Sequence, residues 1–332
     1  MAKPDYIVLH QRGELKRRAD LLKDMYRSCS LCPFACGVDR VAGEVGRCRA
    51  GSNPVLAAVV RHEGEEPPLA VRGGIGNLFF RGCCLRCVYC QNYRISQGYF
   101  KAKAKAEAET ETEEINDKEL AKIFLKLDRE SAPAIGLVTP THFIPSIVEA
   151  IGTAAEHGLE LPIIYNTSSY ESVEVLRLLD GIVDVYLADL RYASEENARH
   201  YSGVTNYVRI AREAIQEMHR QVGDLELNEE GFAVRGLIIR LLVLPEGIGG
   251  CEESLLWIRD ALGTGVTLSL MAQYYPAYRV CQGGRFSALN RRITPEEYNQ
   301  VVEEAEGLGF ENGWIQDLDS PDSWRPESFF GG

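Results

Sequence analysis

The chain has 332 residues, of which 45% are hydrophobic, so it can bury a full core and has the length of one large α/β domain with an appendage. Its formal net charge of -12 argues against nucleic acid as a partner, because attraction to phosphates needs a basic surface. No apolar stretch approaches the roughly 20 residues of a membrane span, and the N-terminus lacks a signal-peptide pattern, so we expect no membrane partner and a cytoplasmic location.

Four cysteines form a group near the N-terminus. Cys29, Cys32, Cys36 and Cys48 lie in glycine-rich polar sequence with few core residues. Four soft ligands can close a tetrahedral zinc site or hold an auxiliary Fe-S cluster, and either would stabilise a segment with little apolar content. Loose free thiols are the alternative, which four cysteines at such close spacing disfavour. We therefore predict a Cys-rich metal-binding segment over residues 1–70.

A second group of cysteines follows the strand-like run 77–81. Cys83, Cys87 and Cys90 form a C-x3-C-x2-C loop. Three thiolates can hold three irons of a 4Fe-4S cluster and leave the fourth iron open for chemistry, whereas electron-transfer clusters usually take four cysteines. Cys84 also forms a C-x2-C pair with Cys87, so part of a zinc site or a redox dithiol is the alternative. Three cysteines on a single turn favour the open cluster.

Beyond this loop the sequence repeats an apolar run, a turn and an amphipathic stretch. The low-complexity charge run 101–114 is expected to be a solvated surface insertion. Together with the run 78–81, the five apolar runs given below predict six strands that alternate with helices. The last helix is expected to begin at the capping box Thr294-Pro-Glu-Glu297. We predict an α/β fold, a parallel sheet curled into a partial (β/α)6 TIM-type barrel over residues 71–332, with site residues at the carboxyl ends of its strands. The other predicted strands are 134–140, 161–166, 182–187, 236–245 and 266–272, and the predicted helices are 144–158, 173–179 and 205–220.

Longer motifs extend over nearly the whole chain. The early ones are Cys29-Ser-Leu-Cys-Pro-Phe-Ala-Cys-Gly-Val-Asp-Arg40, Glu65-Glu-Pro-Pro68 and Gly82-Cys-Cys-Leu-Arg-Cys-Val-Tyr-Cys-Gln-Asn92. The later ones are Val138-Thr-Pro-Thr-His-Phe143, Tyr165-Asn-Thr-Ser168, Asp184-Val-Tyr-Leu-Ala-Asp-Leu-Arg191 and Ser269-Leu-Met-Ala-Gln-Tyr-Tyr-Pro276. With these motifs the chain resembles the radical S-adenosylmethionine (SAM) superfamily, specifically the PflX-like branch related to pyruvate formate-lyase activating enzymes.

The resemblance implies a 4Fe-4S cluster on Cys83, Cys87 and Cys90 that binds SAM through its open iron and cleaves it reductively to a 5′-deoxyadenosyl radical. It further implies an electron donor such as flavodoxin or ferredoxin, and a hydrogen-donating substrate that is a glycyl radical enzyme, another peptide or a small molecule. A protein of a different class remains the alternative, an Fe-S or zinc protein with an electron-transfer or binding role and no SAM turnover. Detection of SAM cleavage would separate the two classes.

The resemblance also indicates which residues bind SAM, with departures from the family pattern. Tyr89 matches the aromatic position near the adenine. The family's glycine-glycine-glutamate segment, which binds the SAM amino group, is replaced by Thr139-Pro-Thr-His142, so backbone carbonyls and the hydroxyl of Thr139 or Thr141 are the expected acceptors. His142 is a further candidate, or else a structural residue at a strand end.

The remaining cofactor-binding predictions come from later strands. Asn166-Thr167 and Asp189-Leu-Arg191 stand where activating enzymes carry aspartate-threonine and aspartate-leucine-lysine, which shape the SAM site and help to bind a monovalent cation. An amide in place of a carboxylate weakens the case for that cation, while Arg191 can still reach the SAM carboxylate. Arg240 lies in an apolar strand and needs an anion, either the SAM carboxylate or a nearby acidic side chain.

Overall fold

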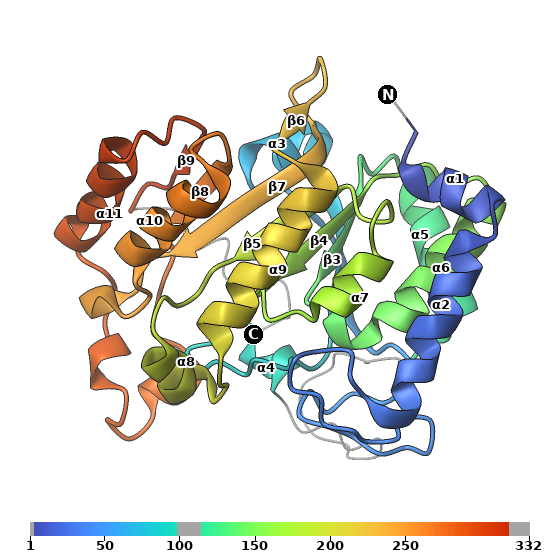
Figure 1. Cartoon of the computed structure of the whole chain (residues 1–332), viewed down its shortest axis with the longest axis horizontal. Coiled ribbons are helices and arrows are strands. Elements are labelled where there is room, and N and C mark those ends of the chain that lie inside the picture. Colours follow the sequence, from blue (N-terminus) through green and yellow to red (C-terminus); the bar gives the residue numbers. More distant parts are fainter. Residues whose placement is uncertain (1–2, 98–113, 319–332) are drawn as a thin grey trace.

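A computed structural model describes residues 3–97 and 114–318, which form one sheet with helices packed against it (Figure 1). The predicted surface insertion 101–114 lies outside the described residues except for Glu114. The strands are β1 (Leu56–His62), β2 (Ile75–Phe80), β3 (Ile135–Val138), β4 (Ile163–Thr167), β5 (Val185–Asp189), β6 (Glu226–Leu227), β7 (Ala233–Leu242), β8 (Thr267–Met271) and β9 (Gly313–Ile315). The helices are α1 (Asp5–Gln11), α2 (Glu14–Asp24), α3 (Pro67–Ala70), α4 (Tyr93–Ser96), α5 (Asp117–Arg129), α6 (Ile144–Glu156), α7 (Val173–Leu178), α8 (Glu195–Ser202), α9 (Tyr207–Val222), α10 (Cys251–Leu262) and α11 (Pro295–Gly307).

The centre of the sheet consists of the parallel strands that the sequence predicts. Strands β2, β3, β4, β5, β7 and β8 are neighbours in chain order, and each pairs with the next in parallel. This order, without a reversal, is that of a TIM-type barrel left open between its first and last strands. The partial-barrel prediction is therefore confirmed. The sequence analysis did not predict β1, which is antiparallel to β2, or β9, which extends the other edge beside β8.

The helices cover the outside of this open barrel. The predicted helices correspond to α6, α7, α9 and α11, and Figure 1 shows α9 crossing in front of β5 and β7. Helix α2, from the N-terminal segment, packs on α6, and Leu15 and Leu22 belong to the same hydrophobic core as Ile147. The predicted boundary at residue 70, between the Cys-rich segment and the barrel, thus stays a prediction. The described residues on both sides of it share one hydrophobic core. No helix in 3–97 or 114–318 is long and apolar enough to cross a membrane.

Side chains alternate along the strands between the helix-covered face and the barrel interior. Toward the amino ends of the strands the interior is apolar and is closed by Leu69 of α3. Toward the carboxyl ends, Asn166, Asp189 and Arg240 face the interior instead. A polar site is therefore built on rigid strands above an apolar floor. That floor includes Ile75, Ala134, Ile164, Val185, Phe232 and Ile238.

The contact between β2 and β3 requires a glycine at position 136. A Cβ on Gly136 would lie 1.8 Å from Asn77 Oδ1 and 3.0 Å from Ile75 Cδ1. We expect Gly136→Ala to lower the free energy of unfolding by about 1–3 kcal/mol, because it displaces Asn77, whose Nδ2 donates to Glu65 at 2.8 Å. Gly152→Ala is the matched control, since its Cβ meets nothing closer than 3.9 Å, and we expect no loss of stability there. Denaturant unfolding measures both variants, and equal stability of the two would contradict this packing argument.

Candidate functional site

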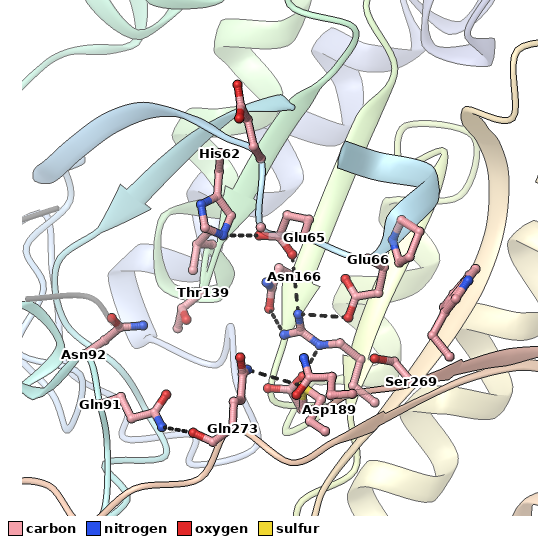
Figure 2. Close-up of a pocket in the computed structure, with 18 of the residues that line it drawn as sticks. His62, Glu65, Glu66, Gln91, Asn92, Thr139, Asn166, Asp189, Ser269 and Gln273 are labelled. Carbon is pink, nitrogen blue, oxygen red and sulfur yellow. Dashed lines mark hydrogen bonds and ion pairs between the residues drawn. The ribbon is translucent and has the colours of Figure 1, made fainter. Parts of the chain in front are cut away.

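A polar cavity of about 430 Å³ lies inside the barrel, between the cysteine loop and the segment that precedes α3 (Figure 2). This volume is within the range of small-molecule sites. Its lining comes from most of the parallel strands, at the carboxyl ends where barrel enzymes place their chemistry. The residues that line it are His62, Glu63, Gly64, Glu65, Glu66, Pro67, Phe79, Gln91, Asn92, Val138, Thr139, Asn166, Asp189, Arg191, Arg240, Ser269, Met271, Gln273, Trp314, Ile315 and Gln316.

The cysteine loop follows β2 directly and adjoins this cavity. Gln91 and Asn92, which come straight after the last cysteine of the loop, line the cavity wall. At the start of the loop Gly82 has φ of 89°, and a Cβ there would lie 2.4 Å from the Cys48 carbonyl oxygen. Only glycine permits both this conformation and so close an approach to the N-terminal segment.

Two of the three loop thiols have hydroxyl neighbours. Ser202 Oγ donates to Cys87 Sγ at 3.0 Å. Ser96 Oγ lies 3.2 Å from Cys90 Sγ. Hydrogen bonds to ligand sulfur tune the potential of an Fe-S cluster, so both serines are positioned to influence a cluster bound here.

The acidities of the loop thiols reflect burial and one nearby cation. A hydrogen bond from the Cys84 thiol lowers the pKa of Cys83 to about 6. Burial raises the pKa of Cys87 and raises that of Cys90 to about 12, and the Arg191 guanidinium opposes the rise at both. Arg191 also contributes, more weakly than Cys84, to the lowered pKa of Cys83. A cation shared by three thiols favours their anionic, metal-binding form.

The donor set fits an anionic cluster on three cysteines. Arg191 Nη2 donates to Asp189 Oδ2 at 2.6 Å, but its buried Nε has no hydrogen-bond partner within the described residues. Over 3–97 and 114–318, no three His, Cys, Asp or Glu side chains gather around the position of a single metal ion. A cubic cluster distributes its irons over separate thiols, so the lack of a single-ion position does not bear on the loop. The assignment of Cys83, Cys87 and Cys90 as ligands stays a prediction.

Arg240 occupies the middle of the cavity and is held by acidic side chains. Its Nε donates to Asp189 Oδ1 at 2.6 Å, and its Nη2 donates to Asn166 Oδ1 at 2.8 Å. Its Nη1 lies 3.6 Å from both Glu65 Oε2 and Glu66 Oε1. The sequence analysis expected either the SAM carboxylate or nearby acidic side chains as the counterion of Arg240. The described structure shows acidic side chains, which balance the charge of the guanidinium without a ligand. Contact of Arg240, Asn166 and Asp189 with SAM stays a prediction, and all three line the cavity.

The two threonines after β3 have different surroundings. Thr139 lines the cavity with φ of 54°, a strained conformation for a β-branched residue and one that is typical of functional positions. Thr141 is 2% exposed, and its hydroxyl donates to Glu171 Oε1 at 2.6 Å. The Thr141 hydroxyl is thus used inside the core and does not line the cavity, and its predicted contact with the SAM amino group stays a prediction. Thr139 stays a predicted acceptor for the SAM amino group as well.

His142 is buried and makes a hydrogen bond to the backbone. Its Nε2 donates to the Arg81 carbonyl oxygen at 2.6 Å, and burial lowers its pKa to about 3. It therefore remains neutral near physiological pH and does not line the cavity.

Tyr89 does not line the cavity and lies within an aromatic group. It is 3% exposed, and its ring centroid lies 6.4 Å from Tyr192 and 6.0 Å from Tyr274, edge to face in both pairs. Such pairs hold the ring in one orientation. Its predicted place near the adenine is not tested by these contacts.

The sequence analysis missed several residues of this site. Glu65 and Glu66 were noted only as part of a motif, yet their side chains are 8% and 7% exposed and both face Arg240. The available signal was a pair of acidic residues directly before Pro67, which begins α3. No local pattern could mark Ser202, because 115 positions separate it from Cys87.

The N-terminal cysteines lie around a buried arginine. Arg40 is 1% exposed, and its guanidinium lies 4.3 Å from the centre of the Tyr26 ring. Its Nε donates to the Gly51 carbonyl at 3.0 Å, and its Nη1 lies 3.9 Å from Cys29 Sγ. These partners within the described residues are all formally neutral, so a buried positive charge stands next to a thiol.

The two cysteine groups adjoin each other. The Cys84 thiol interacts with both Cys32 and Cys83, and this interaction lowers the pKa of Cys32 to about 7. Burial raises the pKa of Cys48 to about 11, and Arg40 opposes that rise. The N-terminal segment and the loop therefore meet through Cys84.

Comparison with known proteins places the chain beside one curated relative. No family model matches the sequence. The chain is 32% identical over 295 residues to the uncharacterized protein MJ0674 of Methanocaldococcus jannaschii, an alignment that covers 88% of this chain and 78% of that protein.

Solved structures give more distant similarities. HydG, described as a maturase of the [FeFe]-hydrogenase, has a TM-score of 0.44 and 12% identity over 70% of this chain and 48% of HydG. HydG from Carboxydothermus hydrogenoformans has a TM-score of 0.45 and 14% identity over 70% of this chain and 50% of that one. The chain thus spans about half the length of these HydG chains.

Proposed function

For this chain, which belongs to the same family as the uncharacterized protein MJ0674 of Methanocaldococcus jannaschii, we propose the activity of a radical SAM enzyme. One observation carries the proposal: a C-x3-C-x2-C loop adjoins a polar cavity at the carboxyl ends of parallel strands, and one arginine influences all three of its thiols. The resemblance of the motifs to that superfamily supports the same activity.

The residues of the loop would hold the cofactor and shield it. Cys83, Cys87 and Cys90 are the proposed ligands of a 4Fe-4S cluster, which supplies the electron that cleaves SAM to a 5′-deoxyadenosyl radical. Arg191 holds a positive charge beside the thiols and is itself fixed by Asp189 at 2.6 Å. Cys87 is buried and Cys83 and Cys90 are half-buried, so the cluster and SAM would themselves complete the exclusion of water that a reactive radical requires.

The cavity residues would bind and orient SAM. Thr139 and Asn166 offer acceptors at the ends of β3 and β4, and Arg191 offers a guanidinium for a carboxylate. We extend the proposal, on the motif resemblance alone, to hydrogen abstraction from a partner protein or peptide, as in the activating enzymes. The electron would come from a flavodoxin or ferredoxin in the cytoplasm.

Anaerobic turnover tests the proposed activity. The full chain is reconstituted with iron and sulfide, reduced and given SAM, and 5′-deoxyadenosine is quantified against samples without reductant. Product that depends on reductant and on bound iron supports a radical SAM enzyme. A bound cluster with SAM present and no product would overturn the proposal in favour of an electron-transfer or metal-binding role.

We also propose that Cys29, Cys32, Cys36 and Cys48 bind a second metal group, zinc or an Fe-S cluster; the four side chains are not grouped around one ion position in the described structure, so zinc would have to draw them together. The supporting observation is the buried Arg40, whose partners in the described residues are formally neutral. A buried guanidinium without a counterion is costly, and metal-bound thiolates would supply the missing negative charge.

Cys32→Ala tests this second site. We expect the variant to bind less zinc or iron at the N-terminal segment and to melt at a lower temperature than the parent, because metal binding to such a segment is also folding free energy. Cys281→Ala is the matched control, since Cys281 is exposed and belongs to neither cysteine group. Thermal melts with and without a chelator measure the effect. A Cys32→Ala melt identical to that of the parent under both conditions would contradict the second site.

A further inference from the structure

A group of arginines lies around the cysteine loop. Arg86 belongs to the loop itself, and Arg47 holds the loop from the N-terminal segment, because its Nε donates to the Cys84 carbonyl oxygen at 2.9 Å. After β8 the chain returns to the loop, where the Arg279 backbone N–H donates to the Val88 carbonyl oxygen at 3.1 Å. None of these arginines lines the cavity, so SAM binding does not account for them. We call the group the arginine patch, and its members are Arg47, Arg49, Arg86 and Arg279.

The positive charge of the arginine patch is not balanced by carboxylates. Among the described residues, Arg86 and Arg279 form no ion pair with an acidic side chain, and Arg279 Nε donates to the Tyr278 hydroxyl oxygen at 3.2 Å. Burial lowers the pKa of Arg86, and the guanidinium groups of Arg49, Arg47 and Arg279 lower it further. Like charges act on one another in this way only where they lie close together. The patch therefore carries a local excess of positive charge.

The sequence around the patch contains no acidic residues, in contrast to the chain as a whole. The segments 45–62, 81–97 and 272–292, to which its arginines belong, include no aspartate or glutamate. The whole chain has 48 acidic residues against 36 lysines and arginines. A positive patch on a protein of negative net charge attracts an acidic partner to one place and repels it from the rest of the surface.

Aromatic side chains lie among these arginines. Phe34 is 38% exposed, and the Arg47 guanidinium lies 4.8 Å from the centre of its ring. Tyr93, which follows the loop, stacks on Tyr278 with ring centroids 5.0 Å apart. Arginine and aromatic residues are enriched at the centres of protein–protein interfaces. This composition indicates a protein partner, since a small anion needs no aromatic surface.

The position of the patch indicates which kind of protein it binds. A protein substrate must place its reacting atom in the cavity, which the arginine patch does not line. An electron donor has only to approach the cluster, and Arg86 lies between Cys83 and Cys87, two of the proposed ligands. Figure 1 shows α4, which follows the loop, and α8 at the end of the barrel opposite α3. The Val88 N–H donates to the Tyr201 carbonyl oxygen of α8 at 2.8 Å, so the patch belongs to this end.

We propose that the arginine patch is the docking surface for an acidic electron-carrier protein. The proposal rests on the proposed function only in calling the docked protein the electron donor. The flavin or Fe-S group of the carrier loses one electron, and the cluster on the loop gains it. No proton or other group moves between the two proteins. Carboxylates around the exposed cofactor of the carrier pair with the guanidinium groups of the patch.

Calorimetric titration of the reconstituted full chain with a flavodoxin and with a ferredoxin tests the docking surface. Both carriers are added in their oxidised forms and without SAM, so that binding is measured apart from turnover. We expect at least one carrier to bind, and its affinity to fall by about tenfold or more when the salt concentration rises from about 0.05 M to about 0.5 M, because salt screens exposed charges. Affinity that does not change with salt would overturn the proposal.

Arg279→Glu assigns the binding to the patch, with Arg12→Glu as the matched control. Both arginines are exposed and both substitutions change the net charge equally, but Arg12 lies at the end of α1, far from the loop in sequence. We expect Arg279→Glu to weaken carrier binding by about tenfold and to lower 5′-deoxyadenosine formation with the reduced carrier. With dithionite as the reductant we expect product equal to that of the parent. Arg12→Glu should retain carrier binding and product.

Other results would contradict the docking surface. Equal carrier binding by Arg279→Glu and Arg12→Glu would overturn it. So would a loss of product with dithionite in Arg279→Glu, because Arg279 would then serve the cluster or SAM. A short DNA duplex that binds more tightly than either carrier and displaces it would assign the patch to nucleic acid instead.

The inference and the proposed function fail separately in these experiments. Salt-dependent carrier binding through Arg279 by a protein that forms no 5′-deoxyadenosine with dithionite would retain the docking surface and overturn the radical activity. Product with dithionite from a protein that binds neither carrier at the patch would retain the activity and overturn the docking surface.

Discussion

Replacement of Cys87 by alanine is expected to abolish reductant-dependent formation of 5′-deoxyadenosine and to lower the iron and sulfide bound by the loop. The reason is that a C-x3-C-x2-C loop has no spare ligand at this position, and a cluster with only two cysteines is not held. The fold should survive, because Cys87 is one small side chain at the edge of a large core. Iron and sulfide analysis together with the product assay measure the change.

Two other cysteines serve as controls for this variant. Cys251→Ala removes a thiol of similar burial, 8% against 6% exposed, from a helix outside both cysteine groups, and should retain product and iron. Cys84→Ala distinguishes the two possible sets of cysteine ligands, because Cys84 belongs only to the alternative C-x2-C pair with Cys87. Retained product in Cys84→Ala supports the three-cysteine cluster. Iron content and product unchanged in Cys87→Ala would refute it.

The parallel strands could be predicted from the sequence because each is a continuous apolar run. Such runs are typical of strands buried on both faces, and β4 and β5 are buried along nearly their whole length. The capping box of α11 is confirmed, since Thr294 Oγ1 accepts from Glu297 N–H at 3.2 Å. Strand β1 was missed because it is a partly exposed strand, paired antiparallel to β2, without an apolar run on both faces.

The site was predictable only in part. Cysteine spacing indicated the loop, and the resemblance to the activating enzymes indicated Asn166, Asp189 and Arg191, all three of which line the cavity. The partners of Arg240 could not be chosen in advance, because Glu65 and Glu66 reach it from a segment far away in sequence. A buried charge indicates that a counterion exists, whereas only the fold decides which one is near.

Replacement of Arg240 by methionine is expected to lower the free energy of unfolding by about 3–5 kcal/mol, because one partner of a buried ionic network is removed. In the variant Asp189 retains its ion pair with Arg191, and Glu65 retains its hydrogen bond from Asn77. Glu66 loses the guanidinium of Arg240, which lies 3.6 Å away in the parent. Burial already raises the pKa of Glu66 in the parent, and Arg240 opposes that rise. We expect the pKa of Glu66 to rise further in the variant.

The pH dependence identifies the cause of this loss. A carboxyl group whose pKa is raised in the folded state binds more protons folded than unfolded, so stability falls as pH rises through the folded pKa. The loss in Arg240→Met should therefore be larger at about pH 8 than at about pH 5, as measured by denaturant unfolding at both. Arg235→Met on the same strand is the control, because Arg235 and its partner Asp5 are 35% and 61% exposed and such pairs contribute no more than about 1 kcal/mol. A loss of stability in Arg240→Met that is independent of pH would mean that Arg240 stabilises the barrel by packing alone. A loss no greater than that of Arg235→Met would mean that the acidic side chains need no cation from the protein.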